Sequence, residues 1–160
     1  ESVSVTPYIS PQYDMAVLKT DIQSELSEPN IELSAGGCIL GQNVYMIGFP
    51  YPGWISYNSQ EFNRNRPLPF LKKACLSAAT PNHDTYFLDG HNNPGFSGGP
   101  VIFYDYQERV FKVLGVISGY INHNGKVIST SDIKLSYQEN SGIAYACNIK
   151  HAADIIEKEF

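Results

Sequence analysis

Short apolar runs, each closed by glycine, proline, asparagine or a charged residue, constrain the fold of this chain most strongly. In most of these runs apolar and polar side chains alternate, which is the pattern of a half-buried β-strand. Such runs cover residues 1–9, 13–20, 41–50, 71–79, 84–90, 100–105, 109–121 and 141–149. One segment, 150–160, instead places its apolar residues at helical spacing. Many short strands and one terminal helix predict an all-β protein, an antiparallel barrel or sandwich.

Two stretches between these runs predict loops. Residues 51–69 mix aromatic, asparagine and proline residues without a period, which is typical of a long surface loop, and such loops are often functional. Asn124 and Gly125 form a dipeptide that favours a hairpin turn.

The composition indicates a packed globular protein and excludes several partners. Hydrophobic residues make up 42% of the chain and charged residues 17%. The net charge is −5 and the basic residues are scattered, so neither a nucleic-acid surface nor an anionic-membrane surface is expected. No run of about 18 apolar residues occurs, so no membrane segment is expected. The three cysteines form no CxxC pair, and together with the absence of Asn-x-Ser/Thr sites they favour a reducing, cytoplasmic compartment. No His, Cys and Asp cluster has metal-ligand spacing and no phosphate-binding glycine loop occurs, so no metal or other cofactor is expected.

Ser97 lies in the segment His91–Asp105, HNNPGFSGGPVIFYD, among glycines at positions 95, 98 and 99. A serine that attacks a carbonyl needs a tight loop that exposes its hydroxyl and aims two backbone N–H groups at the developing oxyanion. Glycines permit such a loop because they adopt positive φ and let a substrate backbone come close. The alternative is a plain glycine turn between two strands. The motif favours a nucleophilic Ser97.

The segment GFSGGPV resembles the nucleophile loop GxSGGP of the trypsin-like (chymotrypsin-fold) serine peptidases, in particular bacterial HtrA-like and glutamyl-endopeptidase-like members. YDMAVLKT is similar to the strand that carries their aspartate, and GQNVYMIGFPYP to the strand that opens their second barrel. KVLGVISGY resembles one wall of their specificity pocket, and SGIAYACNI followed by a helix resembles the ending of HtrA-like domains. The resemblance covers most of residues 8–160 and leaves the 51–69 and 121–140 loops as individual features. It implies a chymotrypsin-like antiparallel β-barrel.

The resemblance also implies roles for particular residues. Ser97 is the expected nucleophile, and Asp14 is the expected triad carboxylate that orients the catalytic histidine. The N–H groups of Gly95 and Ser97 are the expected oxyanion hole. The expected substrate-binding residues are Ser118, Gly119 and Tyr120, which pair with the substrate backbone, and His91, at or near the base of the S1 pocket.

The chain departs from the family at two positions. Phe96 stands just before the serine, where many secreted relatives carry an aspartate that pairs with a newly cut N-terminus, so activation by that ion pair is not expected. The second departure is larger, because the family's catalytic histidine precedes the aspartate and no histidine precedes Asp14.

None of the four histidines has the expected place of the general base. His91 is closest in sequence to the serine, but the resemblance assigns it to the substrate pocket. His83 and His123 lie in Asn-rich turns, and His151 begins the terminal helix. These three are expected at the surface.

The missing histidine indicates that this chain is a segment of a larger two-barrel domain. Residues 1–34 are expected to be the end of the first β-barrel with the inter-barrel linker, and residues 35–160 the complete second barrel with the C-terminal helix. The N-terminal portion that carries the histidine has then been cleaved off, sits in another chain or lies upstream of this segment. The expected partners are a polypeptide substrate and, where it is a separate chain, the missing N-terminal half of the same domain.

Two functions from different classes follow. The first is a trypsin-like serine endopeptidase that forms an acyl-enzyme on Ser97 with a base supplied from outside this segment, which is expected to be inactive alone. The second is a catalytically degenerate module that binds peptides or protein partners through its groove. The aromatic residues Trp54, Tyr57 and Phe62 of the long loop offer a contact surface for the second.

Overall fold

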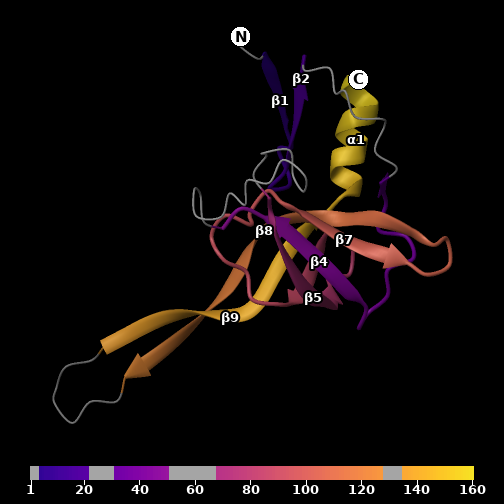
Figure 1. Cartoon of the computed structure of the whole chain (residues 1–160). Coiled ribbons are helices and arrows are strands. Elements are labelled where there is room, and N and C mark those ends of the chain that lie inside the picture. Colours follow the sequence, from indigo (N-terminus) through magenta and orange to yellow (C-terminus); the bar gives the residue numbers. More distant parts are fainter. Residues whose placement is uncertain (1–3, 22–30, 51–67, 128–134) are drawn as a thin grey trace.

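The computed structural model describes residues 4–21, 31–50, 68–127 and 135–160. Its elements are β1 (Val5–Ile9), β2 (Ala16–Thr20), β3 (Glu32–Leu33), β4 (Asn43–Gly48), β5 (Phe70–Ala79), β6 (Thr85–Asp89), β7 (Pro100–Asp105), β8 (Val110–Val127), β9 (Leu135–Asn148) and α1 (Lys150–Glu159). The β1–β2 hairpin and α1 stand together at one end of the molecule, and the remaining strands form its body (Figure 1). Most of the predicted 51–69 loop, including Trp54, Tyr57 and Phe62, lies outside the described residues.

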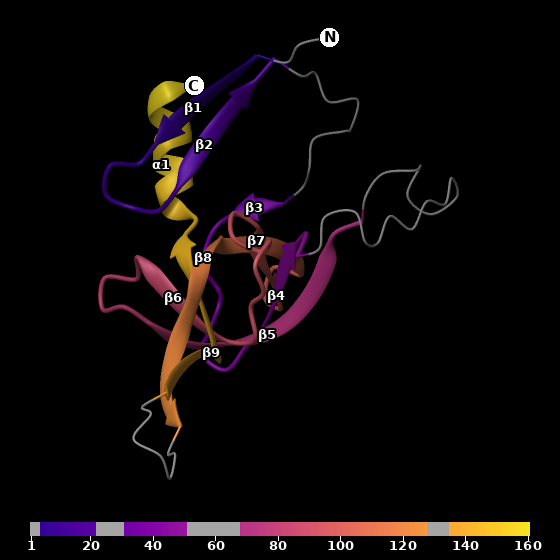
Figure 2. The same cartoon turned by 90° about the vertical axis from the view of Figure 1, so that its left-hand side faces the viewer.

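Within the described residues, six strands close into an antiparallel barrel. The strands β8, β7, β4, β5, β6 and β9 are neighbours in this order, and β8 pairs with β9 to complete the ring. Closure leaves no free edge along the ring. The short strand β3 adds to β8 in parallel, outside the ring (Figure 2). The predicted all-β barrel with a C-terminal helix is therefore confirmed.

Alternating side chains fill the barrel. In β4 the buried positions are Val44, Met46 and Gly48, with less buried residues between them. The main core consists of Val44, Met46, Ala74, Leu76, Tyr86, Leu88, Phe96, Val101, Phe103, Leu114, Ile117, Ala144 and Ala146. Full burial of a side chain such as Leu88 or Phe103 contributes roughly 2–3 kcal/mol. Since Phe96 directly precedes Ser97, the candidate nucleophile is attached to this core.

An ion cluster around the buried Lys112 and Asp105 stabilises one side of the barrel. The Lys112 ammonium in β8 lies 3.1 Å from Asp105, 2.9 Å from Glu108 and 3.5 Å from Glu32. These carboxylates raise the pKa of Lys112. Hydrogen bonds from the Glu108 N–H, from Lys112 and from the Gln107 N–H hold the pKa of Asp105 below its usual value. The cluster joins β3 to the β7–β8 connection, and its opposite charges keep the Asp105 carboxylate and the Lys112 ammonium ionised.

Beyond the barrel, β8 and β9 continue as a paired two-stranded arm (Figure 1). The hairpin turn predicted at Asn124 and Gly125 is wrong, because both residues are still paired, with Gln138 and Tyr137. A Cβ on Gly125 would lie 2.2 Å from the Tyr137 ring, so the glycine makes room for an aromatic ring inside the strand pair. Residues 121–127 and 135–140 of the predicted 121–140 loop therefore belong to β8 and β9, and residues 128–134 lie outside the described part.

The β1–β2 hairpin forms a separate sheet beside α1. Val5 pairs with Thr20 at one end and Ile9 with Ala16 at the other, as the predicted tight connection requires. The Tyr13 ring stacks on His151 of α1 at a centroid distance of 3.4 Å. The expectation of a surface His151 is therefore wrong. Only 7% of His151 is exposed, because Tyr13 covers its ring. The sequence did not predict this burial, since the hairpin lies far from His151 along the chain. No helix of the described residues is long and apolar enough to span a membrane.

Candidate active site

Two consecutive tight turns shape the loop between β6 and β7. In the first, the Phe96 N–H donates to the Asn93 carbonyl at 3.3 Å, and Gly95 has a φ of +96°. Proline at the second position and a positive-φ glycine at the third define a type II turn. The sequence Asn93-Pro94-Gly95-Phe96 therefore matches its backbone at every position.

The second turn begins where the first one ends. The Gly99 N–H donates to the Phe96 carbonyl at 2.9 Å, and Gly98 has a φ of +84°. Ser97 stands at the corner of this second type II turn, where its side chain is exposed. A Cβ on Gly98 would meet nothing within 4 Å, so the space beside the serine is open.

The end of β4 forms the base on which the loop rests. The Phe49 N–H donates to the Gly95 carbonyl at 3.0 Å. A Cβ on Gly95 would lie 2.4 Å from the Phe49 carbonyl oxygen, and one on Gly99 would lie 2.0 Å from that of Ile47. Both glycines are therefore required by close backbone approach, and Gly95 also by its positive φ.

A chain of hydrogen bonds joins Ser97 to Asp14. The Ser97 hydroxyl donates to the Ser118 carbonyl oxygen at 3.4 Å. The Ser118 hydroxyl donates in turn to Oδ2 of Asp14, 104 positions away in the sequence. Asp14 lies in the bend just before β2, so the N-terminal hairpin brings its carboxylate to the barrel. Three residues expected in the site are thus brought together from three separate parts of the chain.

Two backbone donors beside Ser97 have no acceptor in the part of the chain that the structure describes. Within the described residues, the N–H groups of Gly95 and of Ser97 itself donate to no acceptor. Their neighbours Phe96, Gly98 and Gly99 all donate to carbonyls. The loop therefore satisfies its structural donors and leaves unpaired the two that were expected to bind an oxyanion.

No protein-family profile matches the chain, and no curated protein matches it either. The crystal structure of Rv3671c protease in its inactive form is similar, with a TM-score of 0.56 and 20% sequence identity. The likeness covers 98% of this chain and 66% of that one, so this chain spans just under two thirds of the protease's length. The chain has a chymotrypsin-like fold.

This chymotrypsin-like barrel holds no histidine in contact with the candidate site. All four histidines are among the described residues, and none makes a hydrogen bond or ion pair with Ser97 or Asp14. His83 and His123 are exposed, as predicted, and His91 is exposed as well. The predicted turn at His123 is wrong, because this residue lies in β8 and pairs with Glu139. His151 is buried beside Asp84, its Nε2 3.1 Å from Oδ1 without an aligned hydrogen bond. Burial lowers the pKa of His151.

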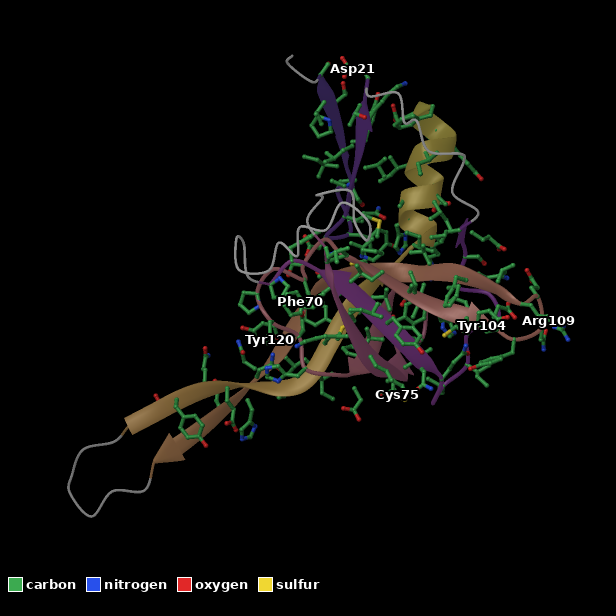
Figure 3. The ribbon with its side chains drawn as sticks, viewed as in Figure 1. Asp21, Phe70, Cys75, Tyr104, Arg109 and Tyr120 are labelled. Carbon is green, nitrogen blue, oxygen red and sulfur yellow. The ribbon has the colours of Figure 1, made fainter. Side chains whose placement is uncertain are left out.

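The residues expected to bind substrate lie along β8 and at the end of β6. Ser118, Gly119 and Tyr120 belong to β8, and Tyr120 lies where the barrel passes into the arm (Figure 3). His91 follows β6, and its carbonyl accepts a hydrogen bond from Lys72 at 2.8 Å. Their role in substrate binding stays a prediction.

Asn92 and Lys72 contact residues around the candidate active site, although no sequence motif marks either of them. Asn92 is 1% exposed, and its amide donates to the Gly119 carbonyl at 3.3 Å. Its Oδ1 has no partner among the described residues. For Lys72 a signal was present, since alternation along β5 places it on the same face as Ala74 and Leu76. Asn92 had no such signal.

Two of the three cysteines are poor candidates for a second reactive centre. Burial raises the pKa of the Cys147 thiol, and burial with the nearby Asp105 charge raises that of Cys38 to about 11. Such thiols stay protonated near neutral pH and are poor nucleophiles. No group of three or more His, Cys, Asp or Glu in the described ranges could hold a metal ion.

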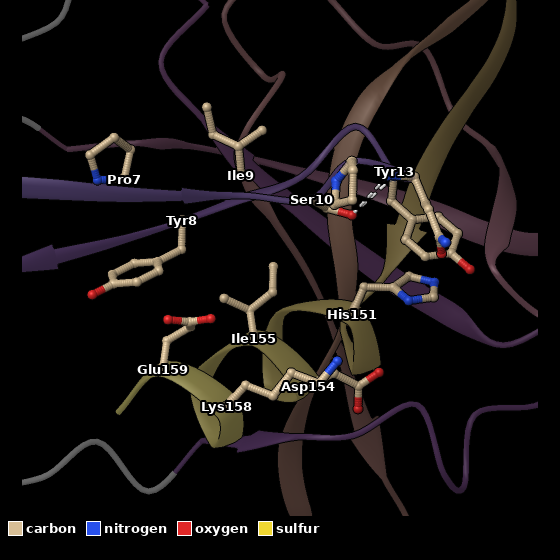
Figure 4. A pocket seen from close by; sticks show the side chains of 12 residues that line it. Pro7, Tyr8, Ile9, Ser10, Tyr13, His151, Asp154, Ile155, Lys158 and Glu159 are labelled. Carbon is tan, nitrogen blue, oxygen red and sulfur yellow. Dashed lines mark hydrogen bonds between the residues drawn. The ribbon is translucent and has the colours of Figure 1, made fainter.

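A cavity of about 540 Å³ opens between the hairpin and α1 (Figure 4). Its lining includes Tyr8 and Tyr13 from the hairpin side and His151, Asp154 and Ile155 from the helix. None of its lining residues belongs to the group around Ser97. It is therefore separate from the candidate active site.

Proposed function

We propose that this chain is the part of a trypsin-like serine endopeptidase that supplies the nucleophile and the triad carboxylate. The observation that carries this proposal is the hydrogen-bonded path from Ser97 through Ser118 to Asp14. A carboxylate near an exposed serine, at a loop with two free N–H donors, is the arrangement that acyl transfer needs. The fold, which resembles that of a protease, supports it further.

The chemistry follows from these groups. A base removes the proton of the Ser97 hydroxyl while its oxygen attacks the substrate carbonyl carbon, and the carbonyl π electrons move onto oxygen. The N–H groups of Gly95 and Ser97 stabilise this oxyanion. When the C–N bond breaks, the base returns its proton to the leaving amine and an acyl-enzyme remains. Water then attacks the ester with the same assistance, which releases the acid and restores Ser97.

The other residues that the sequence motifs mark are assigned to substrate binding. Ser118, Gly119 and Tyr120 bind the substrate backbone along β8, and His91 lies near the base of the S1 pocket. The likeness to HtrA-like and glutamyl-endopeptidase-like enzymes rests on the sequence motifs alone.

The general base comes from outside this segment. A serine hydroxyl is almost wholly protonated near pH 7 and needs a base to act. The four imidazoles of the chain are held elsewhere. We propose that this base is a histidine from outside these 160 residues, which belongs to a partner where it lies on a separate chain.

A fluorophosphonate probe tests the proposal. The wild-type chain is expected to form a covalent adduct that peptide mapping places on Ser97, at a low rate because the base is absent. Ser97→Ala removes the adduct, whereas Ser77→Ala, at an exposed serine of β5, does not. An adduct that persists in Ser97→Ala, or none under any condition, overturns the assignment.

A degenerate peptide-binding module is the second candidate. The placement of all four histidines away from Ser97 and Asp14 favours it. It predicts peptide binding along β8 that Ser97→Ala leaves unchanged, with no adduct on any variant.

A further inference from the structure

Lys72 occupies an unusual position for a cation. Along β5 the side chains of Phe70, Lys72, Ala74 and Leu76 share the face toward the barrel, whereas Lys73 points outward and is exposed. Lysine is rarely placed on a core face unless its charge has partners. Burial lowers the pKa of Lys72, which shows that this position costs the ammonium some of its solvation.

The partners of Lys72 among the described residues lie in the loop that leads to Ser97. The ammonium donates to the His91 carbonyl oxygen at 2.8 Å and to Oδ1 of Asn93. It also lies 5.3 Å from the centre of the Phe96 ring. In the part of the chain that the structure describes, no carboxylate is within ion-pair distance of Lys72.

These contacts leave the ammonium little capacity for another ligand. It has three N–H donors, of which two are bound to oxygen atoms of His91 and Asn93. An aromatic ring faces it as well. Lys72 is therefore placed to hold the loop, and a substrate carboxylate has no obvious donor to use there.

The clamped residues control one of the oxyanion donors. Asn93 begins the first type II turn and Phe96 ends it. A type I turn over the same residues would rotate the peptide between Pro94 and Gly95 by roughly half a revolution, since the two turn types differ in that peptide. The N–H of Gly95 would then point away from its present direction. An interaction that holds this turn in its type II form therefore also fixes the direction of the Gly95 N–H.

We infer that Lys72 is a positioning residue that keeps the turn before Ser97 in its type II form and so holds the Gly95 N–H in place. It contacts the loop at both ends of the turn. This explains how the loop is ordered with Phe96 where secreted relatives carry an ion-pairing aspartate. The inference rests on the proposed function for its catalytic meaning, but the loop contacts stand without it.

Hydrogen exchange of the unliganded chain tests the positioning itself. In Lys72→Met the amides of Phe96 and Gly99, which close the two turns, are expected to exchange about tenfold faster or more, while the amides of β6 and β9 do not change. Lys73→Met, on the exposed face, is the matched control and should leave all rates unchanged. Equal acceleration throughout the barrel shows a general loss of stability, and no acceleration shows no clamp; either result overturns the inference.

Labelling kinetics test the catalytic meaning. With fluorophosphonate and added imidazole, Lys72→Met should lower the maximal labelling rate of Ser97 about tenfold and leave the half-saturating probe concentration unchanged. Lys72→Arg should restore part of the rate, because it keeps donors for the same oxygens. A change in half-saturation alone means that Lys72 contacts the ligand and contradicts a positioning role. A wild-type chain without any labelling refutes the proposed function, while hydrogen exchange still decides the role of Lys72.

Discussion

The hydroxyl of Ser118 donates to Asp14, and the carbonyl of the same Ser118 accepts from Ser97. One residue of β8 therefore contacts both the proposed nucleophile and the proposed carboxylate. The contact joins the N-terminal hairpin to the barrel at the point where the chemistry is expected. It makes Ser118 the first position to test.

Removal of the Ser118 hydroxyl should weaken the site without unfolding the barrel. In Ser118→Ala, Asp14 loses a charge-assisted hydrogen bond, which is worth about 1.5–3 kcal/mol, while the Ser118 carbonyl is kept. We expect the imidazole-assisted labelling rate of Ser97 to fall about tenfold. The same rate measured on Ser77→Ala is the control. An unchanged rate in Ser118→Ala shows that Asp14 does not take part.

Crowding at Gly99 should matter more for stability than positive φ at Gly98. A Cβ at position 99 would lie 2.0 Å from the Ile47 carbonyl oxygen, whereas one at 98 meets open space. We expect Gly99→Ala to lower the free energy of unfolding by about 2 kcal/mol or more and Gly98→Ala by about 1 kcal/mol. Urea denaturation of both variants measures the difference. The opposite order contradicts the close packing of the loop on β4.

His151 should make the chain less stable in mild acid. Burial lowers its pKa in the folded state, so the folded chain favours the neutral imidazole. The stability that this contributes is present above the ordinary histidine pKa of about 6.5 and is lost as pH falls below it. The urea midpoint of the wild type should therefore fall between about pH 6.5 and pH 5. His151→Phe, which can still stack on Tyr13, should show a smaller fall.

The sign of this pH effect is decisive. If the wild type gains stability on acidification over this range, the imidazolium pairs with Asp84 and the assignment of a neutral His151 is wrong.

The ion cluster around Lys112 should add a second, more acidic transition. Its hydrogen bonds hold the pKa of Asp105 below the ordinary value of about 3.9, so its stabilisation is present above that pH and is lost as pH falls further. Asp105→Asn should lower the melting temperature by several degrees at pH 7 and by less near pH 3. Measurement of melting temperature against pH checks this. A difference that does not change with pH contradicts a role for the Asp105 charge.

Much of the fold could be predicted because alternation is a local property. The runs at 41–50 and 100–105 became β4 and β7 since every second side chain could enter one core. The prediction of a turn at Asn124–Gly125 was wrong because a local turn signal competes with cross-strand pairing. Both residues pair with β9, where Gly125 leaves room for the Tyr137 ring.

The site could be predicted only where a motif marks it. The glycines of the Ser97 loop are a local signal with a physical cause. The burial of His151 beneath Tyr13 and the unpaired Oδ1 of Asn92 depend on residues distant in the sequence. The alternation along β5 indicates that Lys72 lies on the inward face, but it does not indicate which residues Lys72 contacts.

Chemical rescue by imidazole tests the central claim most directly. If Ser97 and Asp14 are two thirds of a triad whose base is missing, free imidazole should accelerate fluorophosphonate labelling of Ser97 in proportion to its neutral form, whose fraction increases as pH rises through the pKa of imidazole. The acceleration should fall at least tenfold in Asp14→Asn and vanish in Ser97→Ala. Labelling that imidazole does not change, or that imidazole changes equally with and without the Asp14 carboxylate, would contradict the account.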